Sequence, residues 1–347
     1  QPLYQAVVHG CRAGLYQETC IEVYLCRILR GTGPGDFYSW KKLGAIGTDL
    51  GALACFFAEP WQRLAPGLSA RAQAWLLSEA AIRLRALGRL AEALEPMRAG
   101  AQMRVEQEAW KNAAVSYSNL SELQLSLGHI ALAIADAERS VDYADRSGDA
   151  FQRMGKRTTL ADARHQQGKR EVARRCFAKA MQIERESEYP LFYALQGLRH
   201  SELLLTEVER AAWGGPAVAE SSETCSQVAL RAAQAQAMPI AKRNNWPLDI
   251  AFNHLTLARC ALYADRLHGR TPGEDAQQHT EAAVAGLRQA GAKHHLPRGL
   301  LTRAWLRHCL NDLPGAQADL DEAQRIAERG GMKLHLADIA LTRARLF

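Results

Sequence analysis

The sequence predicts an all-α fold, a right-handed superhelical solenoid built from about seven antiparallel helix hairpins. The composition favours helix formers such as Ala, Leu, Arg, Gln and Glu. No alternation of apolar and polar residues with period 2 runs beyond about five residues, which argues against strands. A short motif also recurs every 40 residues, with Gly88, Gly128 and Gly168 at equivalent positions. Such a fixed period indicates a repeat architecture.

Each copy of the motif predicts a helix, a tight turn and a second helix. The Gly lies near the end of the first helix, and a small Ala five residues later lets the second helix cross closely. The equivalent alanines are Ala93, Ala133 and Ala173. The turn is short, so the two helices must be antiparallel neighbours. One such hairpin cannot bury its own apolar face, and the hairpins must therefore stack.

Less regular hairpins are expected on both sides of these copies. Near the start, Gly14 lies in a similar turn, and near the end Asp312 replaces the Gly, because Asp tolerates unusual turn conformations. Gly330 and Gly331 are expected to stop a helix. Further helices are expected at residues 255–266, 274–289, 318–328 and 334–347.

We therefore expect one continuous solenoid over residues 1–347. Irregular hairpins would occupy residues 1–69, regular 40-residue repeats 70–210, and irregular repeats with a capping helix 211–347. The helical pattern already runs at Leu3, so we expect the chain to be a fragment of a larger protein. Stretches rich in Gly and Pro predict loops at residues 31–35, 59–67, 213–216 and 269–273.

Composition and charge argue against several classes of protein. The net charge of +6 comes from basic residues interspersed with acidic ones, and no run of like charges marks a nucleic-acid arm. No stretch approaches the ~20 apolar residues of a membrane helix, and no signal peptide is apparent. The eight cysteines form no C-x-x-C pair, so we expect free thiols packed as small apolar side chains in a cytoplasmic protein.

No arrangement of residues indicates an enzyme, and we expect no bound metal or cofactor. The chain has neither an H-E-x-x-H nor a G-x-S-x-G motif, and the Gly-rich residues 31–36 lack a Lys that would reach a phosphate. On a helix, the rings of His294 and His295 would point about 100° apart, a poor arrangement for joint metal binding. We expect these two histidines to be solvated or to cap a helix. Three tryptophans are expected to anchor the core: Trp75, Trp110 and Trp305.

The Leu-Gly-x-x-x-x-Ala core within a helical hairpin resembles the tetratricopeptide repeat, in its longer 40-residue form. The likeness covers residues 70–347 well and 1–69 loosely. Several stretches further resemble the C-terminal sensor arm of bacterial signalling ATPases of the STAND class: residues 110–114, 119–123, 145–149, 296–301 and 327–332. The family implies that the repeats recognise a trigger or hold an inactive state while a separate domain performs the chemistry.

The resemblance also implies a binding surface on the concave face. Tetratricopeptide arrays bind there through the first helix of each pair, at positions 2, 5 and 9 when the Gly is position 8. In this sequence these positions are Ile82, Arg85, Arg89, Glu122, Leu125, His129, Asp162, His165 and Lys169. This mixed surface suits a polypeptide with apolar and polar contacts, and a merely solvated face is the alternative.

A second set of candidates lies on one face of the predicted second repeat. Asn112, Ser116 and Asn119 are spaced i, i+4 and i+7, so they lie on one side of a helix. They would hydrogen-bond a peptide backbone if they line the groove. Ordinary polar packing between helices is the alternative.

Four functional hypotheses remain open. The leading one is a protein- or peptide-binding module that acts as the sensor or scaffold arm of a larger bacterial signalling or defence protein, with other domains of its own chain among the partners. The second is a peptide-responsive regulator whose solenoid closes on a short signalling peptide. It predicts an Asn-rich groove, and asparagines are few: Asn112, Asn119, Asn244, Asn245, Asn253 and Asn311. The others are an undetected enzyme and a purely structural assembly role.

Overall fold

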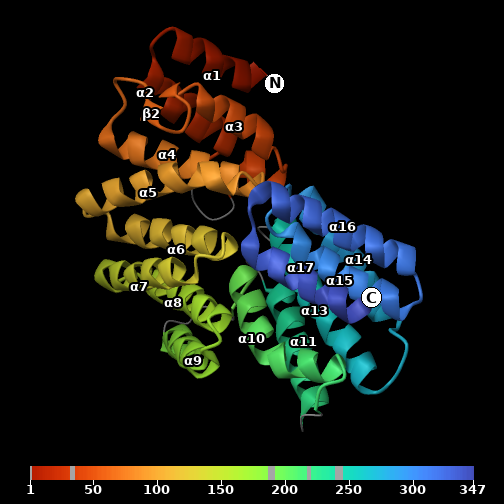
Figure 1. The fold of residues 1–347 in the computed structure, drawn as a ribbon. Coiled ribbons are helices and arrows are strands. Elements are labelled where there is room, and N and C mark those ends of the chain that lie inside the picture. Colours follow the sequence, from red (N-terminus) through yellow and green to blue (C-terminus); the bar gives the residue numbers. More distant parts are fainter. Residues whose placement is uncertain (1, 32–35, 187–191, 217–219, 239–244) are drawn as a thin grey trace.

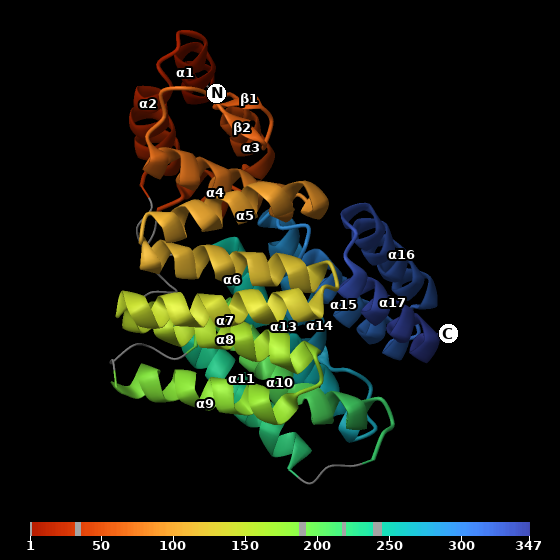
Figure 2. The same cartoon turned by 60° about the vertical axis from the view of Figure 1, so that its left-hand side comes forward.

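A computed structural model describes residues 2–31, 36–186, 192–216, 220–238 and 245–347. Most of the loop predicted at residues 31–35 lies outside these ranges, and so does Asn244. Helices that follow one another in the sequence pack as neighbouring pairs along the described chain (Figures 1 and 2). The predicted all-α solenoid of helix hairpins is confirmed.

The three regular repeats form the middle of the N-terminal half. Their first helices begin 40 residues apart, as the sequence predicts. The six helices are α4 (Ala70–Ala86), α5 (Leu90–Glu106), α6 (Trp110–Ser126), α7 (Ile130–Ser147), α8 (Ala150–Gln166) and α9 (Arg170–Glu186). They lie side by side as a curved stack on the left of Figure 1.

The turn of each repeat has the predicted geometry. Gly88, Gly128 and Gly168 have φ angles of +80°, +81° and +83°, a left-handed region that glycine enters without a steric penalty. The alanines that follow are fully buried where the second helix crosses the first: Ala93, Ala133 and Ala173. Ser69 and Asp149 cap the amino ends of α4 and α8 by accepting a backbone N–H three residues later.

The N-terminal segment is less regular, as expected for residues 1–69. It contains α1 (Pro2–Arg12), α2 (Tyr16–Glu18), the π-helices η1 (Thr19–Leu29) and η2 (Tyr38–Lys42), and α3 (Ile46–Ala54). The predicted loop at 59–67 is partly wrong. Two short strands, β1 (Phe57–Glu59) and β2 (Arg63–Leu64), pair there as an antiparallel hairpin. This hairpin is too short to show an alternating pattern in the sequence.

The C-terminal half continues the series of helix pairs and ends with one capping helix. Its elements are α10 (Leu195–Ala212), α11 (Ser221–Ala237), α13 (Pro247–Leu267), α14 (Glu274–Gln289), α15 (Leu296–Cys309), α16 (Leu313–Gly330) and α17 (Lys333–Leu346). In the last hairpin Asn311, with a φ of +63°, takes the left-handed position that the sequence analysis assigned to Asp312. Asp312 instead caps α16 by accepting the N–H of Gly315.

The solenoid returns on itself, so the C-terminal helices lie against the N-terminal repeats (Figure 2). The backbone N–H of Lys293, before α15, donates to the carbonyl of Ala86 at the end of α4, with N and O 2.8 Å apart. Helix α17 packs against α6. One hydrophobic cluster joins Leu84 and Leu127 of the repeats to Met332 at the start of α17. This closure places the ends of helices from both halves in one region.

The remaining predictions about the core are largely met. All eight cysteines are free, four of them buried and only Cys26 exposed. Trp305 is buried and stacks on Trp213 with ring centroids 3.6 Å apart, whereas Trp75 and Trp110 are half-buried. No helix in the described ranges is long and apolar enough to cross a membrane.

Candidate functional site: a cavity at the closure of the solenoid

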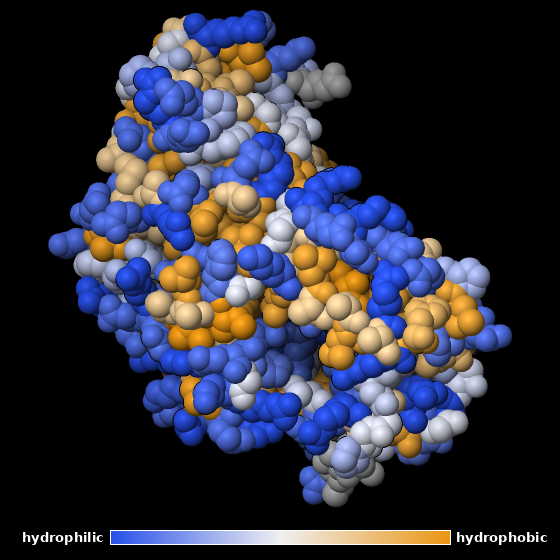
Figure 3. Space-filling model, viewed as in Figure 1, coloured by the Kyte–Doolittle hydropathy of each residue, from blue (hydrophilic) through white to orange (hydrophobic). Residues whose placement is uncertain are grey.

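A cavity of about 430 Å³ lies where the two halves meet, and we call it the central cavity. From the carboxyl-terminal parts of α4, α6 and α8 it is lined by Arg85, Glu122, Leu125, Ser126 and Asp162. From the amino ends of α10, α15 and α17 it is lined by Leu195, Arg199, His294, His295, Arg298, Leu334 and His335. The space-filling view in Figure 3 shows the surface hollowed near its middle, between the N-terminal and C-terminal helices.

Glu122 is the central acid of this cavity. Its carboxylate accepts from Arg85 at 3.0 Å and forms an ion pair with Arg199 at 2.6 Å. Burial alone would raise the pKa of Glu122, but the two guanidinium groups outweigh burial and lower this pKa to about 2. Glu122 is therefore ionised at neutral pH and joins the first half of the chain to the second through Arg199.

Two further carboxylates hold the surrounding arginines. The Oδ2 of Asp162 lies 3.4 Å from the Nε of Arg199, and burial raises the pKa of this aspartate. On α10, Glu202 accepts from Arg298 at 2.7 Å and from Arg259 at 2.9 Å. Burial opposes the ionisation of Glu202, yet the two arginines lower its pKa to about 2. Two groups of ion pairs thus hold the arginines of the cavity, one around Glu122 and one around Glu202.

These ion pairs leave some buried polar atoms without a hydrogen bond. Both ring nitrogens of His294 have no partner, and neither has Nδ1 of His335, which lies 3.8 Å from a carboxylate oxygen of Asp338 without bonding to it. The Nε atoms of Arg85 and Arg298 also have no hydrogen-bond partner, and the Nε of Arg199 makes no hydrogen bond although Asp162 lies 3.4 Å away. Buried polar groups are nearly always hydrogen-bonded to protein or to water, so this concentration marks donors and acceptors that are available to a bound polar molecule.

Some of the residues predicted to face the groove line the central cavity, and others do not. Positions 2 and 5 of the repeat supply the cavity residues Arg85, Glu122, Leu125 and Asp162. Position 9 does not, because it follows the Gly and lies in the turn beyond the helix end. Arg89, His129 and Lys169 are accordingly exposed, and Arg89 pairs with Glu92 on its own helix pair.

The remaining predicted residues lie outside the cavity. Ser116 is buried and accepts a hydrogen bond from Arg104 of α5 at 2.8 Å, which is polar packing between helices. Asn112 is exposed, and the carbonyl of Asn119 accepts from Arg85. His165 is half-buried with its Nε2 3.0 Å from the hydroxyl of Thr206 on α10. The binding role of all these residues stays a prediction.

The expectation that His294 and His295 are solvated or cap a helix is wrong. Both are buried in the turn that precedes α15, and their ring centroids lie only 3.9 Å apart. The expected divergence of about 100° assumed a continuous helix, which these two residues do not form. Neither side chain makes a capping bond to α15.

Sequence reasoning missed the part of the cavity that the C-terminal half contributes. Arg199, Arg298 and His335 follow the last glycine motif, that of Gly168, so no glycine marks their concave positions. One pattern was available in the sequence: Arg199 follows Leu195 and Leu198 on the apolar face of a helix, and a charge at such a position needs a buried partner.

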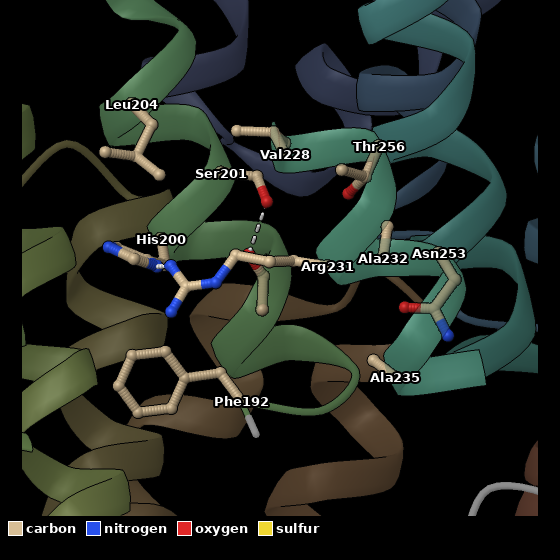
Figure 4. Close-up of a pocket in the computed structure, with 11 residues that line it drawn as sticks. Phe192, His200, Ser201, Leu204, Val228, Arg231, Ala232, Ala235, Asn253 and Thr256 are labelled. Atoms are coloured by element: carbon tan, nitrogen blue, oxygen red, sulfur yellow. Dashed lines mark hydrogen bonds between the residues drawn. The ribbon is translucent and has the colours of Figure 1, made fainter. Parts of the chain in front are cut away.

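A second pocket, of about 440 Å³, lies between α10, α11 and α13 and is lined in part by Phe192, His200, Arg231 and Asn253. Figure 4 shows the side chain of Arg231 reaching towards His200, and their nearest nitrogens are 3.4 Å apart. Burial, and then Arg231, lower the pKa of His200 to about 4, so the ring is neutral and can accept from the guanidinium group. Its polar groups are more nearly satisfied than those of the central cavity.

Among the described residues, no group of three or more His, Cys, Asp or Glu side chains is placed to hold a metal ion. No protein-family model matches the chain, and no curated protein matches its sequence. The fold is similar to that of a Rap protein whose crystal structure contains Competence and Sporulation Factor, with a TM-score of 0.56 and 10% identity over 82% of this chain and 72% of the other. At this identity the similarity shows the fold alone, which is a tetratricopeptide-like helical repeat.

Proposed function

We propose that this chain binds a polypeptide, either a peptide or a segment of a partner protein, in the central cavity. The observation that carries the proposal is the position and lining of this cavity. It lies between the two halves of the solenoid and combines charges of both signs with Leu125, Leu195 and Leu334. A surface that mixes apolar side chains with a few convergent polar groups suits a polypeptide ligand.

The solved structure of similar fold supports a binding role. That Rap protein was crystallised as a complex with Competence and Sporulation Factor. A shared fold does not transfer a ligand, so the site is argued from the residues of this chain. The proposal assigns the chain recognition and no chemical reaction of its own.

Binding would act through the closure of the solenoid. Glu122 of α6 and Arg199 of α10 meet at the cavity, and a ligand between them would contact both halves at once. Such a ligand favours the closed arrangement by its differential contacts. Each hairpin contacts mainly its neighbours, so small rotations add along the array and change its curvature.

Two biological settings fit this mechanism. The first is the sensor arm of a larger bacterial signalling or defence protein of the STAND class, which the sequence resemblance implies. The second is a regulator that closes on a short signalling peptide. The return of α17 onto α6 favours the second, because the solenoid is already closed around its cavity. The asparagines do not favour it, since Asn112 is exposed and Asn253 lines the other pocket.

The test is a selection of peptides on the full chain with a random displayed library. Ser126→Trp would fill the cavity, because Ser126 lines it and its hydroxyl donates only to the carbonyl of Glu122, four residues earlier. Ser226→Trp is the matched control, since the exposed Ser226 makes the same bond to the carbonyl of Ser222.

We expect selected peptides to bind the wild type and Ser226→Trp equally, and Ser126→Trp at least about tenfold more weakly, a difference of about 1.4 kcal/mol. Hydrogen exchange should show protection at the ends of α6, α10 and α17. Peptides that bind all three proteins equally, or a selection that enriches none, would rule out the central cavity as a polypeptide site.

A further inference from the structure

His294 is the least satisfied side chain of the central cavity. It is 7% exposed, and neither Nδ1 nor Nε2 has a hydrogen-bond partner. One face of its ring packs on His295. A neutral imidazole carries one N–H donor and one acceptor, and burying both unpaired is unfavourable. An apolar side chain would fill the same space without this penalty, so the two nitrogens indicate a polar binding partner in this cavity.

Three other atoms at the cavity are N–H donors that make no hydrogen bond. The Nε–H groups of Arg85 and Arg298 are buried without a nearby acceptor, and that of Arg199 has only the ion-pair contact of 3.4 Å with Asp162. The Nη atoms of these residues bind Glu122 and Glu202. The cavity therefore offers an excess of N–H groups and lacks acceptors. Oxygen atoms of a ligand would supply the missing acceptors.

The charged side chains that line the cavity are predominantly positive, which also favours a ligand with acceptor oxygens. Three guanidinium groups line it against two carboxylates, those of Glu122 and Asp162. Burial raises the pKa of Asp162, which reduces the negative charge further. The first turns of α10, α15 and α17 also lie at the cavity, and the amino end of a helix carries a partial positive charge.

From this geometry we propose that the central cavity binds an anionic group, a carboxylate or a phosphate, between His294 and the guanidinium groups of Arg199 and Arg298. The inference rests on the proposed function and specifies its ligand. The anion would be a carboxylate of the bound polypeptide or a small free anion, and both would use the same donors.

Binding of an anion at His294 would be linked to a proton. Burial, and then Arg85, hold the pKa of His294 well below its usual value, so the ring is neutral at pH 7. An anion at the ring raises this pKa, and binding then takes up a proton and tightens as the pH falls. The charged and titratable groups that face His294 are Arg85 on α4, Glu122 on α6, Asp162 on α8, Arg199 on α10, His295 and Arg298 at α15, and His335 on α17.

The experiment is a titration of the full chain with acetate and with inorganic phosphate, against chloride at equal ionic strength. Histidine side-chain NMR signals report the site, and calorimetry in two buffers of different ionisation enthalpy reports proton uptake. We expect one signal, absent in His294→Phe, to move with acetate or phosphate and not with chloride. Affinity should rise several-fold from pH 8 to pH 6.

His294→Phe should bind the anion at least about tenfold more weakly than the wild type. Its melting temperature should be no lower, because the substitution removes two buried nitrogens without hydrogen bonds. A purely structural histidine would give a less stable protein with unchanged binding. The control is His268→Phe, an exposed histidine on the carboxyl end of α13. If His294→Phe does not fold, His294→Gln tests the same point, since it should bind the anion without proton uptake.

Peptides from the selection identify the source of the anion. Versions with an amidated C-terminus, or with Asn and Gln in place of Asp and Glu, should bind at least about tenfold more weakly when a peptide carboxylate is the ligand group. Binding of phosphate or acetate alone would assign the site to a free anion. Peptides that are blocked by Ser126→Trp but insensitive to these changes and to His294→Phe would overturn the anion site and leave the polypeptide site intact. No shift with either anion or with any peptide carboxylate would also overturn it.

Discussion

Two arginines of α4, Arg83 and Arg85, lie two residues apart and have opposite surroundings. Arg83 is fully buried, and its guanidinium group lies 2.6 Å from Glu79 and 3.4 Å from Asp49. Arg85 is 9% exposed and has one carboxylate partner, Glu122, which it shares with Arg199. Two acids thus surround the single arginine of the first cluster. In the second cluster Arg85 and Arg199 share Glu122, and the further acid Asp162, whose ionisation burial opposes, lies 3.4 Å from Arg199. The first cluster therefore has no guanidinium charge left over, whereas the second keeps positive charge for a ligand.

Unpaired atoms alone do not separate the two clusters. Beside Arg83, the hydroxyl of Tyr24 and Nε1 of Trp40 also have no hydrogen-bond partner. The difference is space and charge, because Arg85 faces a cavity of about 430 Å³ while the Trp40 ring packs 4.6 Å from the Arg83 guanidinium carbon. A ligand site needs room for the missing acceptors, and the second cluster lines such a cavity.

The largest effect is expected from removing the charge of Arg83, which tests whether the first cluster stabilises the fold. Arg83→Met would leave Asp49 and Glu79 buried without a cation, and we expect it to destabilise the protein by about 3–5 kcal/mol. Urea unfolding followed by tryptophan fluorescence measures the loss. Arg71→Met, an exposed position at the start of the same helix, is the control and should stay within about 0.5 kcal/mol of wild type. A loss below about 1 kcal/mol would mean that the buried network contributes little.

The contribution of Glu122, the acid of the second cluster, to the free energy of unfolding should depend on pH. The pKa of Glu122 is lowered from 4.5 to about 2 in the folded chain, so its contribution is fully present above pH 4.5 and is lost as the pH falls through 2. At pH 7 this shift corresponds to at most about 3 kcal/mol. Glu122→Gln should therefore cost about 2–3 kcal/mol at pH 7 and clearly less at pH 3.

Urea unfolding at pH 7, 4 and 3 measures the difference between Glu122→Gln and wild type. The control is Glu95→Gln, since Glu95 is an exposed carboxylate paired with Arg98, and it should cost about 0–1 kcal/mol at each pH. A cost of Glu122→Gln that does not change with pH would mean that its carboxylate is not what joins the two halves.

The sequence predicts the repeats because their determinants are local. Gly88, Gly128 and Gly168 fix three turns, and helices follow from the spacing of apolar residues between them. The closure has no such local determinant. It depends on contacts such as that of Lys293 with Ala86, which are separated by about two hundred residues and by most of the solenoid.

The candidate site is predictable to the same extent. Arg85, Glu122 and Asp162 follow from their positions in the repeat, whereas Arg199, His294 and His335 enter the cavity only when the chain returns on itself. The repeat pattern assigned both Arg85 and Arg89 to the groove. Arg89, however, lies in the turn between α4 and α5, beyond the end of the helix that carries Arg85. The repeat pattern therefore identifies half of the cavity, and in the other half the charge of Arg199 on an apolar helix face is the one signal that the sequence offers.

The smallest expected effect on stability comes from substituting the repeat glycines, which tests the contact of the C-terminal helices with the repeats. Gly128→Ala and Gly168→Ala place an L-residue at nearly equal positive φ, a strain of about 1–2 kcal/mol in each case. An added Cβ at Gly168 meets open space, whereas at Gly128 it lies 2.9 Å from the Cβ of Lys333 in the first turn of α17. Gly128→Ala should therefore cost about 1 kcal/mol more, by overpacking.

Hydrogen exchange at the start of α17 should rise in Gly128→Ala and not in Gly168→Ala, because only the first change separates α17 from α6. Anion binding at His294 should weaken in parallel, since the cavity exists only while the C-terminal helices rest on the repeats. Equal effects of the two substitutions on stability and exchange would mean that the contact between Gly128 and Lys333 does not hold the solenoid closed. The ion pairs of Glu122 with Arg85 and Arg199 would then be what holds the two halves together at the cavity.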